Sequence, residues 1–222
     1  MKSLIKSCVF LACIVTAGFS ASKSFANLVI TEAMSSSGGD TPDWFELTNF
    51  GATAIDITSY RVDDNSASFA LSLPLTGITT IAPNESVVFM ETNAPLTAIP
   101  AFRTFWSNLS PSIQVGSYTG SGIGLSSAGD AVNVFDATPT PGNLIATNAF
   151  GAATTGVSFE FTANNSLATL SVSGINGAYT VPGGTPNVGS PGVTAVPEPT
   201  TIALLGVAGI LGLAARRRMS SN

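Results

Sequence analysis

The side chains best suited to chemistry in this sequence are carboxylates. Asp63, Asp64 and Asn65 stand in a row. In a turn, their oxygens could ligate Ca²⁺, the hard cation of extracellular space. Asp40 with Asp43 is a second candidate pair. No Asp-x-Asp-x-Asp-Gly loop is present, so the competing interpretation is that these are solvated acids that keep the protein soluble.

Exposed aromatic rings are the other candidates for ligand binding, because their faces can stack on sugar rings. Trp44 lies beside Phe45 in a strand-like segment, and we expect it to pack in the core. Trp106 follows Phe102-Arg103-Thr104-Phe105 and is the first candidate for a surface ligand contact.

Most enzyme classes lack their required residues here. The chain has no histidine, which removes Ser-His-Asp triads and nearly every zinc or iron site. Both cysteines, Cys8 and Cys13, lie in the N-terminal apolar run, and no lysine occurs between residues 27 and 195. Without residues 1–26 the protein has no thiol and no lysine for Schiff-base chemistry. We expect no catalytic activity and no cofactor, with Ca²⁺ as the one candidate ion.

A glycosidase would need two carboxylates facing one site. Asp43 and Glu46 are an odd number of residues apart, so on one strand they point to opposite sides. Glu32 shares the face of Ile30 by alternation. We expect it to point inward as a structural carboxylate bonded to backbone N–H groups of a loop.

Composition indicates strands and an acidic body. Only 9% of the 222 residues are charged, against 45% hydrophobic. Between residues 27 and 195 the two basic residues, Arg61 and Arg103, meet twelve acidic ones, a net charge of −10. A field of that sign repels phosphate backbones, so nucleic acid is not an expected partner.

Short alternating segments separated by turns indicate an all-β sandwich or barrel. We predict strands at 28–34, 44–49, 87–90, 131–136, 157–162 and 168–173, with a short helix or helical turn within 93–106. A phase change across Thr58-Ser59 indicates a bulge or turn, and Ala82-Pro83-Asn84-Glu85 is typical of a β-turn. Residues 27–181 form the predicted domain, and the Gly- and Pro-rich residues 182–196 a linker.

The N-terminus has the layout of a secretory signal peptide over residues 1–26. Lys2 and Lys6 precede an apolar run, and small residues before the bond suggest cleavage after Ala26. A permanent membrane helix and a lipoprotein attached at Cys13 are the alternatives.

The C-terminus carries a second apolar run. Residues 200–215 would span about 24 Å as a helix, marginally enough for a bilayer. The cluster Arg216, Arg217 and Arg218 would stay in the cytoplasm as a stop signal.

The four residues Val196, Pro197, Glu198 and Pro199, followed by this helix and the arginines, resemble the PEP-CTERM sorting signal of Gram-negative bacteria. The resemblance implies processing by an exosortase and release to, or retention at, the cell surface, often alongside exopolysaccharide. A simple tail anchor behind a Pro-rich joint is the alternative.

The order of motifs in the body carries a second resemblance. The motifs are Ile30-Thr31-Glu32, Asp43-Trp44-Phe45-Glu46-Leu47, the turn at 82–85, Gly129-Asp130-Ala131-Val132 and Gly189-Ser190-Pro191-Gly192. Together they are similar to the lamin tail domain, an immunoglobulin-like sandwich, over residues 28–192. Tyr60 stands where that family usually has Trp, and Phe159-Glu160 lacks the basic residue that typically follows. The resemblance implies a fold and no catalytic residues.

We therefore expect an exported, non-catalytic β-sandwich with a structural or interaction role at the cell surface or in an extracellular matrix. Signal peptidase and exosortase would process it, and the C-terminal helix would hold the precursor in the inner membrane. Exopolysaccharide or envelope proteins are the expected partners. The alternative is a secreted module that binds a saccharide or a Ca²⁺-bridged polymer.

Overall fold

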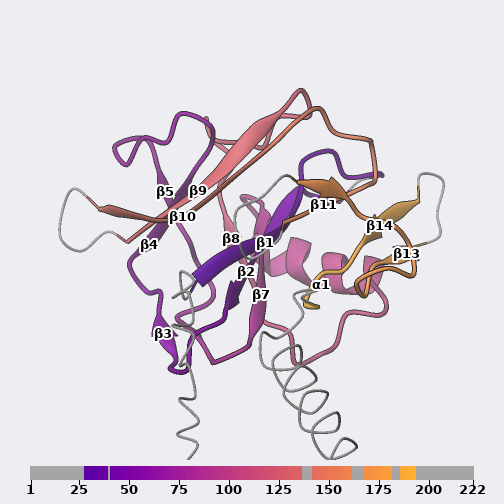
Figure 1. Ribbon diagram of the computed structural model, residues 1–222, viewed down its shortest axis with the longest axis horizontal. Coiled ribbons are helices and arrows are strands. Elements are labelled where there is room, and N and C mark those ends of the chain that lie inside the picture. The colour runs from indigo at the N-terminus through magenta and orange to yellow at the C-terminus, as the bar shows by residue number, and fades with distance from the viewer. Residues whose placement is uncertain (1–27, 40, 137–141, 162–167, 182–185, 194–222) are drawn as a thin grey trace, which may run out of the picture.

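The computed structural model describes residues 28–39, 41–136, 142–161, 168–181 and 186–193 and shows an all-β fold with one short helix (Figure 1). A six-stranded sheet has the order β12-β11-β1-β2-β7-β8, and a four-stranded sheet the order β10-β9-β4-β5. The helices predicted for residues 1–26 and 200–215 lie outside the described residues. In the described ranges, no helix has the length and apolar character needed to cross a membrane.

The strands of the larger sheet are β1 (Leu28–Met34), β2 (Trp44–Asn49), β7 (Ser86–Glu91), β8 (Val115–Tyr118), β11 (Phe159–Glu160) and β12 (Thr169–Leu170). The smaller sheet holds β4 (Tyr60–Asp63), β5 (Leu73–Pro74), β9 (Asp130–Asp136) and β10 (Asn143–Phe150). Two small pairs join β3 (Ile55–Asp56) to β6 (Thr80–Ile81) and β13 (Tyr179–Val181) to β14 (Asn187–Gly189).

One pair of neighbouring strands, β7 and β8, is parallel. Parallel neighbours need a crossover connection, and helix α1 (Pro95–Phe105) lies in it. Pro95 suits the first turn of the helix, where a missing N–H costs nothing.

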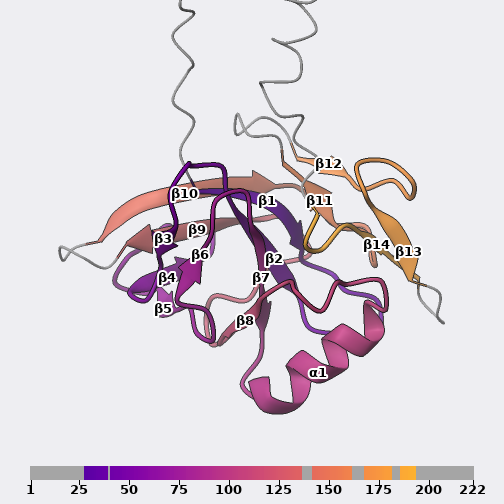
Figure 2. The ribbon, with the colours of Figure 1, turned by 90° about the horizontal axis from the view of Figure 1, so that it is seen from below.

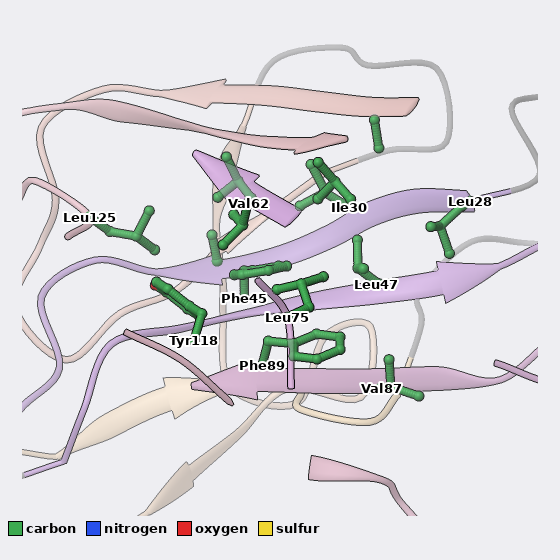
Figure 3. Packing of buried hydrophobic residues seen from close by; sticks show 14 of the residues in the cluster. Leu28, Ile30, Phe45, Leu47, Val62, Leu75, Val87, Phe89, Tyr118 and Leu125 are labelled. Atoms are coloured by element: carbon green, nitrogen blue, oxygen red, sulfur yellow. The ribbon is translucent and has the colours of Figure 1, made fainter. Parts of the chain in front are cut away.

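The first core lies between the two sheets. Phe45 and Leu47 of β2 point into it together with Phe89 of β7, and Val62 and Val134 enter from the smaller sheet. Figure 3 shows Phe45 close to Phe89 and Tyr118, with ring centroids 5.7 and 5.5 Å from that of Phe45. This packing makes the fold a sandwich.

A second core covers the opposite face of the larger sheet. Trp44 of β2 packs edge-on against Trp106, just after α1, with ring centroids 5.8 Å apart. Met90 and Phe102 join them, and Val181 comes from β13. In Figure 2, α1 lies along this side of β2 and β7, near the β13–β14 pair. All six residues of β2 are therefore buried.

Several sequence-based predictions are confirmed. The strands at 28–34 and 44–49 have the predicted bounds, and α1 falls within 93–106. The turn at 82–85 closes with the N–H of Glu85 donating to the carbonyl of Ala82 at 3.1 Å. Strands predicted at 157–162 and 168–173 shrink to β11 and β12, and β8 and β10 were not predicted.

The linker predicted across 182–196 is wrong for residues 187–192. Asn187–Gly189 form β14 and pair with β13. Ser190 and Gly192 donate hydrogen bonds to side chains of the larger sheet. Composition indicated a linker because glycine and proline dominate the segment, but here they shape a tight return of the chain onto the sheet.

Replacing Phe45 with alanine should lower the free energy of unfolding by about 3–5 kcal/mol, because a fully buried ring leaves a cavity in the first core. Chemical denaturation measures this loss. Leu71→Ala, at a side chain that is 62% exposed, is the control and should change stability by less than about 0.5 kcal/mol. Equal effects of the two substitutions would contradict the described core.

Candidate functional site

An irregularity in β1 decides which side chains meet behind the larger sheet. The register between β1 and β2 shifts between Ile30 and Glu32. Ile30 and Ala33, three residues apart, both enter the first core. A bulge of this kind places one extra residue on the strand. Thr31 and Glu32 therefore both belong to the opposite face, and the expectation that Glu32 shares the face of Ile30 is wrong.

Glu32 is the first of two buried carboxylates on that face, with 1% of its surface exposed. Its Oε1 accepts hydrogen bonds from the Ser158 hydroxyl at 2.5 Å and from the Ser190 backbone N–H at 2.8 Å. Its Oε2 accepts from the Ser190 hydroxyl at 3.0 Å. The expected role, a structural carboxylate held by a loop N–H, is confirmed.

Glu46 lies directly opposite Glu32 on β2 and is fully buried. Its Oε1 accepts from the Thr31 hydroxyl at 2.5 Å, and its Oε2 accepts from the Gly192 N–H at 2.5 Å. A row of hydroxyls continues from Thr31 to Thr48 at 2.9 Å and on to Ser86 at 2.7 Å. Every donor to this carboxylate is neutral.

Burial dominates the electrostatics of the pair. It raises the pKa of Glu46 from 4.5 to about 7, although the hydrogen bonds from Thr31 and Gly192 act in the other direction. Burial also raises the pKa of Glu32, to about 8, and the negative charge of Glu46 directly opposite adds to this rise. The two arginines of the described chain bond elsewhere, Arg61 to Ser72 and Arg103 to the carbonyl of Ile113.

This arrangement holds elements together. The donors to the pair come from Thr31 of β1, from Ser158 just before β11, and from Ser190 and Gly192 just after β14. At 1% and 0% exposure neither carboxylate is presented to a substrate. We refer to Glu32 and Glu46 as the carboxylate pair.

The predicted calcium ligands are Asp63, the last residue of β4, and Asp64 and Asn65 in the turn that follows, and internal donors use most of their oxygens. Asp63 Oδ2 accepts from the Ser66 hydroxyl and the Ser68 N–H, both at 2.6 Å. Asp64 Oδ1 accepts from the Ser66 N–H at 2.8 Å, and the N–H of Asn65 donates to Asp130. Asp63 Oδ1 is buried without a hydrogen-bond partner.

No group of three or more acidic or sulfur ligands that could hold a metal occurs among the described residues. Asp43 accepts from the Ser37 N–H at 2.9 Å, and Asp40 lies outside the described part.

Trp106 is not a surface residue, so the expectation of a ligand contact there is wrong. Its ring is 1% exposed and packs edge-on against Trp44, Phe105 and Tyr179. Trp106 lies at the C-terminal end of α1, four residues after Phe102, so both rings face the sheet. The prediction that Trp44 is a core residue is confirmed.

The predicted processing residues lie outside the described residues. These are Ala26, the motif Val196, Pro197, Glu198 and Pro199, and the cluster Arg216, Arg217 and Arg218. Their roles rest on the sequence and on the family comparison.

Fold and sequence together define an immunoglobulin-like sandwich that carries a C-terminal sorting segment. Comparison with protein families matches residues 21–152, more than half of the chain, to the Lamin Tail Domain. The chain belongs to the lamin tail domain family. Residues 195–218 match the PEP-CTERM protein-sorting motif, which indicates export through a membrane-anchored precursor processed by an exosortase. No curated protein and no solved structure matches the chain.

Stability should fall as pH rises from about 5 to about 9. In the unfolded chain both glutamates ionise near their ordinary pKa of 4.5, whereas in the folded state they ionise at about 7 and 8. The folded state therefore holds more protons in this range. The stability present below pH 4.5 is lost as pH rises through the raised pKa values. The loss should be on the order of a few kcal/mol, measured by denaturation at fixed ionic strength.

The double variant Glu32→Gln, Glu46→Gln should flatten this profile. Each carboxylate has an oxygen bonded only to a hydroxyl, of Ser190 or Thr31, and that hydroxyl can accept from a Gln amide instead. A wild-type profile that rises with pH, or one that the double variant reproduces, would contradict this assignment.

Proposed function

We propose that the protein is an exported, non-catalytic β-sandwich that acts by contact at the cell surface or in an extracellular matrix. The observation that carries this proposal is the use of its polar side chains. The carboxylate pair and the 63–68 turn direct nearly all of their oxygens to donors of the same chain. Such groups specify a fold and leave little for reaction chemistry.

Charge supports the same role. The acidic body between residues 27 and 195 would be repelled by nucleic acid and by anionic lipid. Exopolysaccharide and envelope proteins of a Gram-negative cell are the partners that we propose. The folded unit would extend from the signal cleavage site at Ala26 to Val193, beyond the 181 of the sequence-based estimate.

The proposed route has two membrane steps. Signal peptidase would release the N-terminus after Ala26, while the helix at 200–215 and the cluster at 216–218 hold the precursor in the inner membrane. Exosortase would then act near Val196–Pro199, a segment that its prolines keep out of a helix.

Fractionation with intact-mass measurement tests this route. In a host with its exosortase, the mature chain should begin at residue 27, lack the arginine cluster and appear outside the inner membrane. In the same host without exosortase, the chain should keep its C-terminus and stay in the membrane fraction. Full-length chain in the cytoplasm of both hosts would overturn the proposal.

A second candidate function is binding of Ca²⁺ or a Ca²⁺-bridged polymer. It is favoured by one observation, the buried Asp63 Oδ1 that has no hydrogen-bond partner beside Asp64 and Asn65. An ionised oxygen without a donor is costly in an interior and suits a cation ligand.

If this turn binds Ca²⁺, the melting temperature should rise with Ca²⁺ at micromolar to millimolar concentration and not with Mg²⁺. By mass action the gain is about 2.7 kcal/mol at a hundredfold excess over Kd. Asp63→Asn with Asp64→Ala should abolish the shift, and Asp56→Asn, at a carboxylate whose bonds are to Thr58, is the matched control. If Ca²⁺ neither shifts the melting temperature of the wild type in calorimetry nor promotes binding on a glycan array, the second candidate is rejected. The contact role is then the remaining proposal.

A further inference from the structure

The carboxylate pair lies at the end of the folded chain nearest to the sorting motif. β14 ends at Gly189, and Ser190 and Gly192 then deliver three hydrogen bonds to Glu32 and Glu46. Val193 ends the described residues, and the sorting match begins at 195. We call residues 187–192 the clasp.

Two glycines of the clasp allow its backbone to approach the larger sheet closely. Gly192 has φ of +81°, and a Cβ at that position would lie 2.6 Å from Ile113. A Cβ on Gly189 would lie 2.9 Å from Glu32 Oε1 and 3.2 Å from the Trp106 ring. Both glycines therefore bring the backbone closer to the sheet than a larger residue would allow.

Among the residues that the structure describes, the groups around the pair offer no compensating cation. On β11 Glu160 is opposite Glu32 in register, and its Oε2 accepts from Asn176 at 2.8 Å. From β13 comes Tyr179, whose pKa is raised to about 12 by burial and by Glu32, so it stays neutral. Arg103 of α1 bonds the carbonyl of Ile113 behind the clasp. When both members of the pair are ionised, two adjacent buried charges are left with neutral donors only.

We propose that the clasp is a proton-controlled latch on the sorting tail: it is closed while the carboxylate pair holds a proton, and it opens when both carboxylates are ionised. Two like charges directly opposite each other destabilise a strand pair. Entry of water would solvate the two carboxylates and weaken their repulsion. The clasp has short attachments: β14 pairs over three residues with β13, and Val188 makes an isolated bridge with Val157. The Asn187 side chain adds two hydrogen bonds to the backbone of Gly38. The clasp is the element to yield, because β1 and β2 are central strands, each paired with neighbours on both sides in the six-stranded sheet.

Opening changes the reach of the sorting motif. With the clasp closed, Val196 is three Cα-to-Cα steps from Val193, at most about 11 Å of extended chain. With the clasp open, the chain is free from Val181, and the fifteen steps from there to Val196 allow about 50 Å. A membrane-embedded protease must approach the motif, so the latch would set how near the folded domain lies to that protease. This consequence rests on the proposed exosortase route, whereas the latch itself does not.

Hydrogen exchange of the full chain in detergent micelles tests the latch directly. After correction for intrinsic rates, the protection of amides at 187–192 should fall at least about tenfold between pH 6 and pH 9, while β2 and β7 keep theirs. In Glu32→Gln, Glu46→Gln the protection should be the same at both pH values. Asp56→Asn, which removes an exposed carboxylate of β3 whose bonds are to Thr58, is the matched control and should behave as wild type.

Three results would overturn the latch: constant protection of 187–192 in the wild type, equal loss in the double Gln variant, or loss in all strands together. Gly192→Ala should open the clasp without altering the carboxylates and leave 187–192 unprotected at both pH values, so the proposal stays testable if the double variant does not fold.

In a host with its exosortase, Gly192→Ala should be processed faster than the wild type at pH 6. Equal processing with an open clasp would refute the effect on reach. Absence of processing in both chains would refute the proposed route and leave the exchange result standing.

Discussion

The rest of the structure depends on two glutamates that face each other across β1 and β2. Both are buried, and no cation of the described chain bonds to them. Glu32 and Glu46 must be satisfied by neutral donors. β1 and β2 supply only part of these. The remainder comes from Ser158, Ser190 and Gly192, which lie beyond residue 152, where the match to the family ends. The described residues that follow 152 are therefore tied to the first two strands by hydrogen bonds to the carboxylate pair.

The same face explains why the larger sheet is buried on both sides. One face closes the sandwich, and the other is covered by α1 and by the β13–β14 pair (Figure 2). The face under α1 and the β13–β14 pair has an apolar part, centred on Trp44 and Trp106, and a polar part formed by the carboxylate pair. The apolar part supplies most of the burial energy. The polar part determines where the chain returns and thus where the sorting segment leaves the domain.

Sequence patterns predicted the central strands because β1 and β2 are rich in β-branched and aromatic residues between clear turns. The pairing of Glu32 with Glu46 was missed, although two adjacent antiparallel strands could have suggested it. The bulge at Thr31 has no local signal, and it reversed the expected face of Glu32. Trp106 was predicted to lie at the surface because α1 is too short to show a clear hydrophobic periodicity. The sequence therefore does not indicate which face of the helix is buried. The return of Ser190 and Gly192 depends on contacts distant in sequence, which composition does not reveal.

The most direct measurement is the titration of the side-chain carboxyl carbons by ¹³C NMR, since the chain has only six glutamates and Gln variants can assign two of them. The resonances of Glu32 and Glu46 should move in two coupled steps with midpoints above pH about 6.5, Glu46 before Glu32. Two independent titrations near pH 4.5 would show that both carboxylates are solvated, and the pair would then not be what joins the end of the domain to its central strands.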